Sequence, residues 1–229
     1  MKLRILIPCR NEVNAESFAY LCRTMICAAD YWRHRFKEQA DFAFKVIARA
    51  HIVDARCNLL GFALDDGADW VLWLDDDMTP PDDLLERLMR RFDEAPEYDY
   101  IGGLAYKKSA PFGPCAFLAP EHEGAPTWIE RLPERLQGNV GFMGFACVLG
   151  RGAAFRKVYD FAQRKPFVYH NDVGEDSFYF HQARALGQKL AVDTSLVVGH
   201  VGTTVYDHRV FDAFRAANPE IEANMSRPT

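Results

Sequence analysis

Three consecutive carboxylic acids, Asp75, Asp76 and Asp77, are the residues of this sequence best suited to chemistry. Successive side chains of an extended chain alternate in direction, so Asp75 and Asp77 should point to one side and Asp76 to the other. Two carboxylates held side by side repel each other unless a cation or several donors compensate them. Oxygen ligands suit Mg²⁺ or Mn²⁺, which usually keep positions open for substrate phosphates. The triplet therefore predicts a divalent metal site.

A plainer interpretation is a solvated acidic turn whose carboxylates cap a helix that starts near Pro80. The preceding segment favours the metal site, because residues 70–74 are all apolar. That apolar run is too continuous for a strand with one solvent-exposed face and too short for a buried helix. We therefore expect a central parallel strand covered on both sides. In open α/β sheets, ligands bind at the carboxyl ends of such strands.

The elements that must position the triplet follow an alternating pattern, which is typical of a mostly parallel sheet with helices on its faces. Strands are expected in the first half at residues 3–7, 42–47, 70–74 and 98–106. Helices are expected at residues 15–36 and at 55–64, the latter ended by Gly67. A third helix should follow Thr79, whose hydroxyl group is expected to cap it.

The second half begins with a change in composition. Residues 107–133 contain five prolines and little periodicity, which predicts a long loop or excursion of the kind that is often functional. Further elements are expected as strands at 140–149 and 189–198 and as helices at 155–163, 175–186 and 210–217. Gly187 should end the second of these helices. Tyr106, Trp128 and Phe145 are candidates for stacking on a sugar, with simple packing as the alternative.

The length predicts one domain that spans residues 1–229, and the alternating elements predict that it is α/β. The chain has 27 Lys and Arg against 32 Asp and Glu, and no clustered basic segment, which argues against a dedicated nucleic-acid binder but leaves a local basic groove open. Its six cysteines lack the spacing of a zinc site and are expected to be core residues. No stretch is long enough to span a membrane, and the apolar start is too short for a signal peptide. We therefore expect a cytoplasmic protein.

Two segments of the first half carry a family resemblance. The residues Pro8, Arg10 and Glu12, directly after the first expected strand, are similar to the Pro-x-x-Asn-Glu opening of many GT-A glycosyltransferases. Arg56 and Asn58, followed by the strand that leads into the aspartates, look like the Ala-Arg-Asn segment that precedes the DxD motif of these enzymes.

Two segments of the second half extend the resemblance, so that it covers residues 3–202. Glu175 and Asp176 resemble the Glu-Asp helix of these enzymes, and His200 lies at the position of their His-bearing strand end. The resemblance implies a GT-A, Rossmann-like fold of the family 2 type. It also implies a metal-dependent enzyme that moves a sugar from a nucleotide-diphosphate sugar to a hydroxyl acceptor.

Specific roles follow from the same resemblance. The metal, Mn²⁺ or Mg²⁺, would be held by Asp77, by Asp75 directly or through water, and by His200. A metal and an arginine stabilise the negative charge that develops on the departing diphosphate. The residues implied in the nucleotide-sugar site are Pro8, Arg10, Glu12, Arg56, Asp75 and Asp76. Arg56 would meet the base, the ribose or the phosphates.

The acceptor side of the resemblance involves two acids. Asp176 would accept the proton of the acceptor hydroxyl, and Glu175 would orient that hydroxyl or bind a sugar hydroxyl. Plainer alternatives stay open for each partner residue. Glu175 and Asp176 could stabilise a helix start through its dipole, His200 could be a satisfied histidine at a strand end, and Arg56 could be a surface arginine.

Two other functions compete for the triplet. It also matches the opening motif of haloacid-dehalogenase-like phosphatases, with Asp75 as nucleophile and Asp77 as acid/base. That motif normally follows the first strand of its domain, whereas about 70 residues of strands and helices precede it here. A non-catalytic nucleotide-sugar-binding protein is the other alternative. Nucleotidyltransferases are disfavoured, because the segment after the first strand has no glycine-rich loop.

The single domain is expected to divide by function. Residues 1–105 would bind the nucleotide sugar, and residues 106–229 would form the acceptor half and a C-terminal tail. The sequence leaves open the sugar, the nucleotide, the stereochemical outcome and the oligomeric state. A saccharide, a metabolite, a lipid-linked acceptor, a protein and a modified DNA base are all compatible acceptors, although the charge does not indicate a nucleic acid.

Overall fold

A single large sheet forms the middle of the computed structural model, which describes residues 1–119, 127–170 and 173–219. Within those residues the main path of the sheet runs in the order β11-β10-β5-β9-β3-β1-β2, with β4 and β7 paired to β10 beside this path. The sheet strands are β1 (Lys2–Cys9), β2 (Asp41–Ala48), β3 (Trp70–Leu74), β4 (Met78–Thr79), β5 (Tyr100–Ala105), β7 (Leu136–Gln137), β9 (Cys147–Arg151), β10 (Leu190–Val201) and β11 (Val205–Tyr206). A separate small sheet pairs β6 (Ala116–Leu118) with β8 (Val140–Met143).

The strand directions confirm a mostly parallel sheet. β1 pairs in parallel with β2 and β3, and β5 pairs in parallel with β10. β9 lies antiparallel between β3 and β5, and β11 is antiparallel to β10. The expectation for residues 70–74 needs one correction, because β3 has a parallel neighbour on one side only. All five of its residues are buried, as their apolar character predicted.

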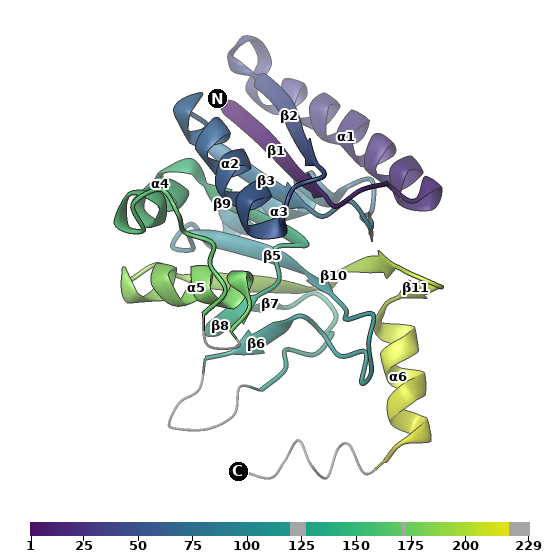
Figure 1. The fold of residues 1–229 in the computed structure, drawn as a ribbon. Helices are drawn as coiled ribbons and strands as arrows, with labels where there is room; N and C mark the ends of the chain where they lie inside the picture. The colour runs from purple at the N-terminus through teal and green to yellow at the C-terminus, as the bar shows by residue number, and fades with distance from the viewer. Residues whose placement is uncertain (120–126, 171–172, 220–229) are drawn as a thin grey trace.

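Helices cover both faces of the sheet, which confirms the expected α/β architecture. They are α1 (Ala15–Phe36), α2 (Ile52–Asp65), α3 (Leu84–Glu94), α4 (Gly152–Phe161), α5 (Glu175–Ala185) and α6 (His208–Ala217), with a short 3₁₀ turn at Lys37–Gln39. α1 and α3 pack together on one face, and α2, α4 and α5 lie on the other (Figure 1). Within the described residues, none of these helices combines the length and apolarity that a membrane crossing needs.

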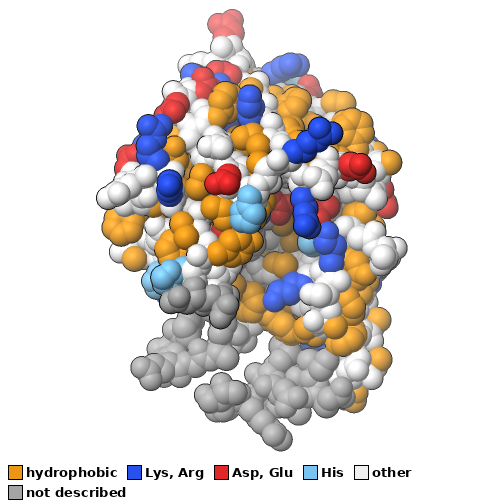
Figure 2. Space-filling model, viewed as in Figure 1, with side chains coloured by type: hydrophobic (Ala, Val, Ile, Leu, Met, Phe, Trp, Pro, Cys, Tyr) orange, Lys and Arg blue, Asp and Glu red, His pale blue; other side chains and the backbone are white. Residues whose placement is uncertain are grey.

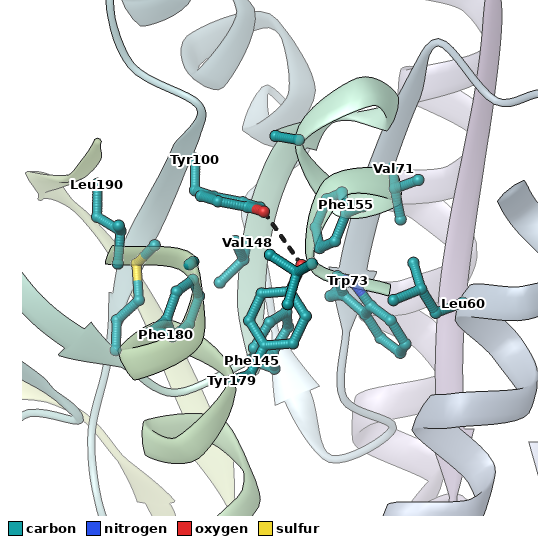
Figure 3. Close-up of a cluster of buried hydrophobic side chains, with 14 of the residues drawn as sticks. Leu60, Val71, Trp73, Tyr100, Phe145, Val148, Phe155, Tyr179, Phe180 and Leu190 are labelled. Atoms are coloured by element: carbon teal, nitrogen blue, oxygen red, sulfur yellow. Dashed lines mark hydrogen bonds between the residues drawn. The ribbon is translucent and has the colours of Figure 1, made fainter. Parts of the chain in front are cut away.

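Each face of the sheet has its own apolar core. Under α2, α4 and α5, aromatic side chains such as Trp73, Phe145 and Phe180 fill the space against the sheet (Figure 3). The hydroxyl groups of Tyr100 and Tyr179 lie 3.1 Å apart in this core, so both buried polar groups have a partner. A second cluster under α1 and α3 includes Trp32, Leu72 and Phe92, all at most 3% exposed.

Local sequence signals explain the ends of several helices. α1 has the predicted bounds, and the Asn14 side chain caps it by accepting a 2.8 Å hydrogen bond from the Glu16 amide. Gly67 and Gly187 follow α2 and α5 with φ values of 73° and 78°, a conformation that glycine adopts without a Cβ penalty. Both glycines thus end their helices as predicted.

Two expected elements are wrong in detail. Residues 140–149 form two strands, β8 and β9, because the backbone between them bonds elsewhere: the Gly144 amide donates to the Cys115 carbonyl at 2.7 Å. Thr79 does not cap a helix. It lies in β4 and pairs with Gly199 of β10, and α3 begins only at Leu84, with Asp83 at its N-cap position.

The proline-rich excursion contains more pairing than expected. β6 lies within residues 107–133, and Phe117 forms an isolated bridge with Trp128. Residues 120–126 of the excursion lie outside the described residues. Tyr106 and Phe145 are 1% and 0% exposed, so the packing interpretation of these two aromatic residues is confirmed. Trp128 is partly buried and packs edge-on against Phe211.

β10 is the element that brings His200 to the aspartates. Its pairing with β5 shifts register between Asp193 and Val197, where the buried Asp193 carboxylate accepts hydrogen bonds from Ser195 and from Arg91 at 2.9 Å. Beyond this irregularity β10 continues to Val201, three residues past the predicted end, and pairs with β4 and β11. His200 therefore lies on an ordered strand.

Candidate functional site

A cavity of about 460 Å³ opens where β1, β3 and β10 end. In Figure 2, the face of the molecule turned to the viewer has a recess near its middle. Acidic side chains lie inside the recess and Lys and Arg side chains lie beside it. The residues that line the cavity are Pro8, Cys9, Arg10, Ala50, His51, Ile52, Ala55, Arg56, Asp75, Asp76, Asp77, Tyr169, Glu175 and His200. The cavity lies at the carboxyl end of the parallel strands, as expected for this class of sheet.

Backbone hydrogen bonds hold the aspartate triplet in place. The Asp75 amide donates to the Ala146 carbonyl at 3.2 Å, and the Val201 amide donates to the Asp77 carbonyl at 2.7 Å. Directly after the triplet, Met78 pairs with His200 across the β4 and β10 ladder. The loop after β3 is thus tied to the end of β10, which places His200 beside the triplet.

Asp77 is paired with two basic side chains. Its Oδ2 atom lies 3.1 Å from His200 Nε2 and 2.5 Å from Lys108 Nζ. Burial acts to raise the pKa of Asp77, but the hydrogen bonds from His200 and Lys108 outweigh it and lower that pKa below its usual range. His200 Nδ1 donates to the Tyr106 carbonyl at 2.8 Å, because a carbonyl can only accept, and this directs Nε2 toward Asp77.

Arg56 joins three further carboxylates in the wall of the cavity. Its guanidinium lies 3.2 Å from Asp75, 2.5 Å from Asp176 and 3.8 Å from Glu175. Only 4% of its side chain is exposed, and it also lies over the ring of Phe145 at 5.3 Å. The alternative of a surface arginine is therefore wrong. Burial raises the pKa of Asp75, and Arg56 opposes that rise.

Asp176 has the most strongly shifted carboxyl group of the site. Burial raises its pKa to about 7; Arg56 opposes this, while Glu175 and Asp75 add to it. One guanidinium shared among three carboxylates cannot compensate all of them, which leaves the pKa of Asp176 raised. The Phe145 amide donates to Asp176 Oδ2 at 3.2 Å and fixes the carboxylate. A carboxyl group with this pKa can accept a proton near neutral pH.

Asp76 has a different partner from its two neighbours. Burial raises the pKa of Asp76, and a hydrogen bond with the Cys9 side chain acts against that rise. The same burial raises the pKa of the Cys9 thiol to about 11, so Cys9 is protonated at neutral pH. Asp76 thus contacts β1, whereas Asp75 and Asp77 contact Arg56 and His200. The predicted alternation is wrong in detail, because the triplet forms a turn after β3 and all three aspartates line the first cavity.

A second cavity of about 390 Å³ lies on the other side of the same wall. It shares Asp75, Glu175 and His200 with the first cavity, and Asp176 lines this second one. Its other lining residues are Lys107, Cys115, Phe117, Phe142, Gly144, Ala146, Gly174 and Ser177. The rings of Phe117 and Phe142 stack with centroids 4.4 Å apart, which gives this cavity an aromatic side.

Most of the predicted site residues come together in these two cavities. Pro8 and Arg10 line the first cavity as expected, whereas Glu12 is exposed and is not among its lining residues. Glu175 and Asp176 do lie in the first turn of α5, where the helix dipole favours acids. Their contacts with Arg56 show that they also belong to the carboxylate cluster.

Some residues at the site carried no recognisable signal in the sequence. Lys108 is one of two consecutive lysines in the expected loop, and nothing in its neighbours pointed to Asp77. Tyr169 and His51 line the first cavity and meet edge to face at 5.9 Å, although they belong to distant segments. Burial together with the Glu175 carboxylate raises the pKa of Tyr169. Such contacts depend on tertiary structure alone.

The side chains of Asp75, Asp77 and His200 are of the types that bind divalent metals. Two carboxylates and one imidazole are ordinary ligands for Mn²⁺, and a metal-binding histidine usually donates its other N–H to a carbonyl, as His200 does to Tyr106. Among the described residues, however, no group of three His, Cys, Asp or Glu side chains is already arranged around a metal position. Asp77 is instead paired with Lys108, and Asp75 with Arg56.

Comparison with known proteins supports one family. Residues 36–160, more than half of the chain, match the family model described as glycosyl transferase family 2. The match includes Arg56 and the aspartate triplet and ends before α5. Among solved structures, the A197 protein from STIV is similar, with a TM-score of 0.61, 18% identity and coverage of 88% of this chain and 86% of that chain. At this identity the likeness shows the fold. Comparison with curated proteins finds no match.

Proposed function

Because the chain belongs to glycosyl transferase family 2, we propose that it moves a sugar from a nucleotide-diphosphate sugar to a hydroxyl group of an acceptor. One observation carries the proposal. Two cavities share a wall that contains Asp75 and Glu175. The second cavity is also lined by Asp176, whose carboxyl group has a pKa near neutral. A transferase of this kind needs such a division, with the donor on one side and the acceptor on the other.

The first cavity is the donor site in this proposal. Its volume of about 460 Å³ is within the usual range for small-molecule sites. Pro8, Arg10 and Asp76, which line this cavity, would contact the nucleotide. Glu12 does not line it, and its part in nucleotide binding stays a prediction from the resemblance. Arg56 lies deeper than expected for a group that meets the base. We therefore assign it to the phosphate and sugar end of the donor, where it also positions Asp75 and Asp176.

Asp75, Asp77 and His200 would hold Mn²⁺ or Mg²⁺ beside the diphosphate. Such an ion stabilises the negative charge on the departing nucleoside diphosphate. Asp77 supplies an ionised carboxylate, since its pKa is lowered. His200 supplies Nε2, and the Tyr106 carbonyl fixes the orientation of its ring.

Asp176 is the proposed base. Its carboxylate would accept the proton of the acceptor hydroxyl while that oxygen attacks the sugar carbon and the diphosphate leaves. The Phe145 amide and Arg56 hold the carboxylate toward the shared wall. Glu175, whose side chain is 11% exposed, would orient the acceptor or bind a sugar hydroxyl.

The division of the chain into two functional halves is also part of the proposal. Most of the residues that line the first cavity come from residues 1–105, and most of those that line the second come from residues 106–229. This distribution supports a donor half and an acceptor half. The two stacked phenylalanines would give the acceptor an aromatic surface to lie against.

A thermal-shift panel tests the proposal. Nucleoside diphosphates and their sugars, each with and without Mn²⁺, should include one pair that raises the melting temperature only when the metal is present. The matching nucleotide sugar should then release its diphosphate during incubation with wild-type protein. Turnover of a phosphomonoester by Asp75 without any response to nucleotide sugars would support the phosphatase alternative. Binding without release, unchanged in Asp176→Asn, would support a non-catalytic binding protein.

A further inference from the structure

The proposed transfer assigns no role to Lys108, a charged residue at the site. Its ammonium group donates to Asp77 Oδ2 at 2.5 Å and to the Val201 carbonyl at 3.3 Å. It therefore joins the aspartate loop to the end of β10. The Lys108 side chain approaches Gly202 so closely that a Cβ atom built there would lie 3.1 Å from Lys108 Cδ. Gly202 leaves room for the lysine to reach Asp77.

The ammonium group contacts an Asp77 oxygen that a metal ion between Asp77 and His200 would also contact. Lys108 covers the same Asp77 oxygen, Oδ2, that His200 Nε2 faces at 3.1 Å. An ion held between Asp77 and His200 would carry its positive charge directly against the ammonium group, which is strongly unfavourable. Repulsion between the two cations therefore makes them compete for this carboxylate.

Four carboxyl groups form the cluster around the site. Among the described residues, the Lys and Arg side chains that contact them are Arg56 and Lys108. The carboxylate residues are Asp75, Asp77, Glu175 and Asp176. The Lys108 side chain is 39% exposed, so solvent lies beside it to hydrate the ammonium group away from Asp77.

We propose that Lys108 is a tethered counter-ion that occupies the metal-facing oxygen of Asp77 in the metal-free protein and leaves it when a divalent metal binds. This inference rests on the proposed function, because it takes Asp77 and His200 as metal ligands. Competition from Lys108 weakens the binding of the metal alone. Once displaced, the ammonium group can pair with the anionic diphosphate of the donor, so that metal and donor bind best together.

The neighbouring lysine provides a matched control. Lys107 points into the second cavity, where its ammonium group lies 5.6 Å from the centre of the Phe117 ring. Replacing it changes the net charge of the protein by the same amount as replacing Lys108. Of the two lysines, Lys108 is the one whose ammonium group contacts Asp77 in the described part of the chain.

The test uses Mn²⁺ alone as the probe and measures its dissociation constant from the electron paramagnetic resonance signal of free Mn²⁺. Lys108→Gln should bind Mn²⁺ about fivefold more tightly than the wild type, the size expected for loss of a partly exposed competing ion pair. Lys108→Arg and Lys107→Gln should stay within about twofold of the wild type, since the first keeps the cation and the second never faced the metal. Thermal melting confirms that each variant is folded.

Equal or weaker Mn²⁺ binding by Lys108→Gln would overturn the inference. Asp77→Asn separates this failure from a failure of the proposed metal site. If Asp77→Asn abolishes Mn²⁺ binding while Lys108→Gln matches the wild type, the metal site stands and the tethered counter-ion is wrong. If Asp77→Asn binds Mn²⁺ as tightly as the wild type, both are wrong.

Discussion

Arg56 is the residue on which the carboxylate cluster depends. A buried cation that contacts three acids lowers their mutual repulsion, and removing one partner of a buried charge network is far more damaging than replacing the whole network. Without the guanidinium, Asp75 and Asp176 would face each other across a gap with no opposite charge. Arg56 thus stabilises the fold and the site at the same time.

Replacing Arg56 with Gln should therefore destabilise the protein in a pH-dependent way. At pH 8 we expect a loss of about 3 kcal/mol in the free energy of unfolding, measured by urea denaturation. The loss should be smaller at pH 5. Without Arg56, the carboxyl groups have higher pKa values in the folded variant than in the unfolded chain. The variant therefore keeps its stability at low pH, where these groups are protonated, and loses it as the pH rises through their folded-state pKa values.

An exposed pair supplies the control for Arg56. Arg164 is 66% exposed and lies 3.3 Å from Asp65, so Arg164→Gln should change stability by less than about 0.5 kcal/mol at either pH. An Arg56→Gln protein with the same pH dependence of stability as the wild type would show that the three acids do not act as a cluster.

Asp176 sets the expected pH dependence of the reaction. Its pKa is raised to about 7, so the base form accumulates as the pH rises through 7. We expect kcat/KM to rise about tenfold per pH unit below pH 7 and to level off above it, and Asp176→Asn to reduce the rate by at least about 100-fold. Steady-state rates between pH 5 and 9 give this profile. A flat profile, or an Asp176→Asn enzyme that keeps wild-type rates, would exclude Asp176 as the base.

The aspartate triplet together with the family resemblance indicated the carboxylate cluster. Asp75, Asp77 and Glu175 could be selected because their motifs have a recognisable order and spacing. Lys108 and Tyr169 could not, because their roles arise from which loops meet in space. The depth of Arg56 was equally hidden, since the sequence does not distinguish an arginine on the buried side of a helix from one on its surface.

At the scale of elements, the irregularity in β10 determines where His200 lies. Asp193 is fully buried at this point, and its carboxylate accepts hydrogen bonds from the Ser195 amide at 3.0 Å, from the Ser195 hydroxyl and from Arg91 Nε at 2.9 Å. Burial acts to raise the pKa of Asp193, but these hydrogen bonds outweigh it and lower that pKa. The strand changes register here and then continues to the site.

Asp193→Asn should show how much this irregularity depends on the charge. We expect a loss of about 3 kcal/mol in unfolding free energy at pH 7, because Arg91 would lose its buried partner. Because the pKa of Asp193 is lower in the folded protein than in the unfolded chain, its charge stabilises the fold above the unfolded-state pKa of about 4. This stabilisation is lost as the pH falls through the folded-state pKa. The difference from the wild type should therefore shrink below pH 4.

Asp30→Asn is the matched control for Asp193, because the Asp30 side chain is 69% exposed and pairs with the neighbouring His34. Its stability should stay within about 0.5 kcal/mol of the wild type at every pH tested. A constant difference between Asp193→Asn and the wild type down to pH 3 would contradict the proposed contribution of the Asp193 charge.

Periodicity predicted the long elements and failed at the short ones. α1 was predicted with its observed bounds, because apolar spacing and the Asn14 cap agree over 22 residues. β8 and β9 were merged into one strand, since both are apolar and the turn between them is set by a hydrogen bond to the distant Cys115 carbonyl. β4 was missed because two residues carry no pattern, and Thr79 resembles a helix cap.

At the scale of the whole molecule, residues from both halves of the chain meet at the wall that the two cavities share. The family model matches residues 36–160, yet Glu175, Asp176 and His200 lie beyond that match and still meet the aspartate triplet. The α/β class and the mostly parallel sheet were predictable from alternating strands and helices. The antiparallel position of β9 was not, because direction within a sheet depends on connections rather than on composition.

Release of nucleoside diphosphate from the matching nucleotide sugar, compared between the wild type and Asp77→Asn with Mn²⁺ present, tests the metal-assisted transfer most directly. Asp77→Asn replaces the carboxylate with a neutral amide of nearly the same shape, so the fold should persist while the metal loses its main ligand. The account predicts that release by the variant falls by at least about 100-fold, a loss of several kcal/mol of charge stabilisation. Release that survives within a few-fold of the wild type would contradict it.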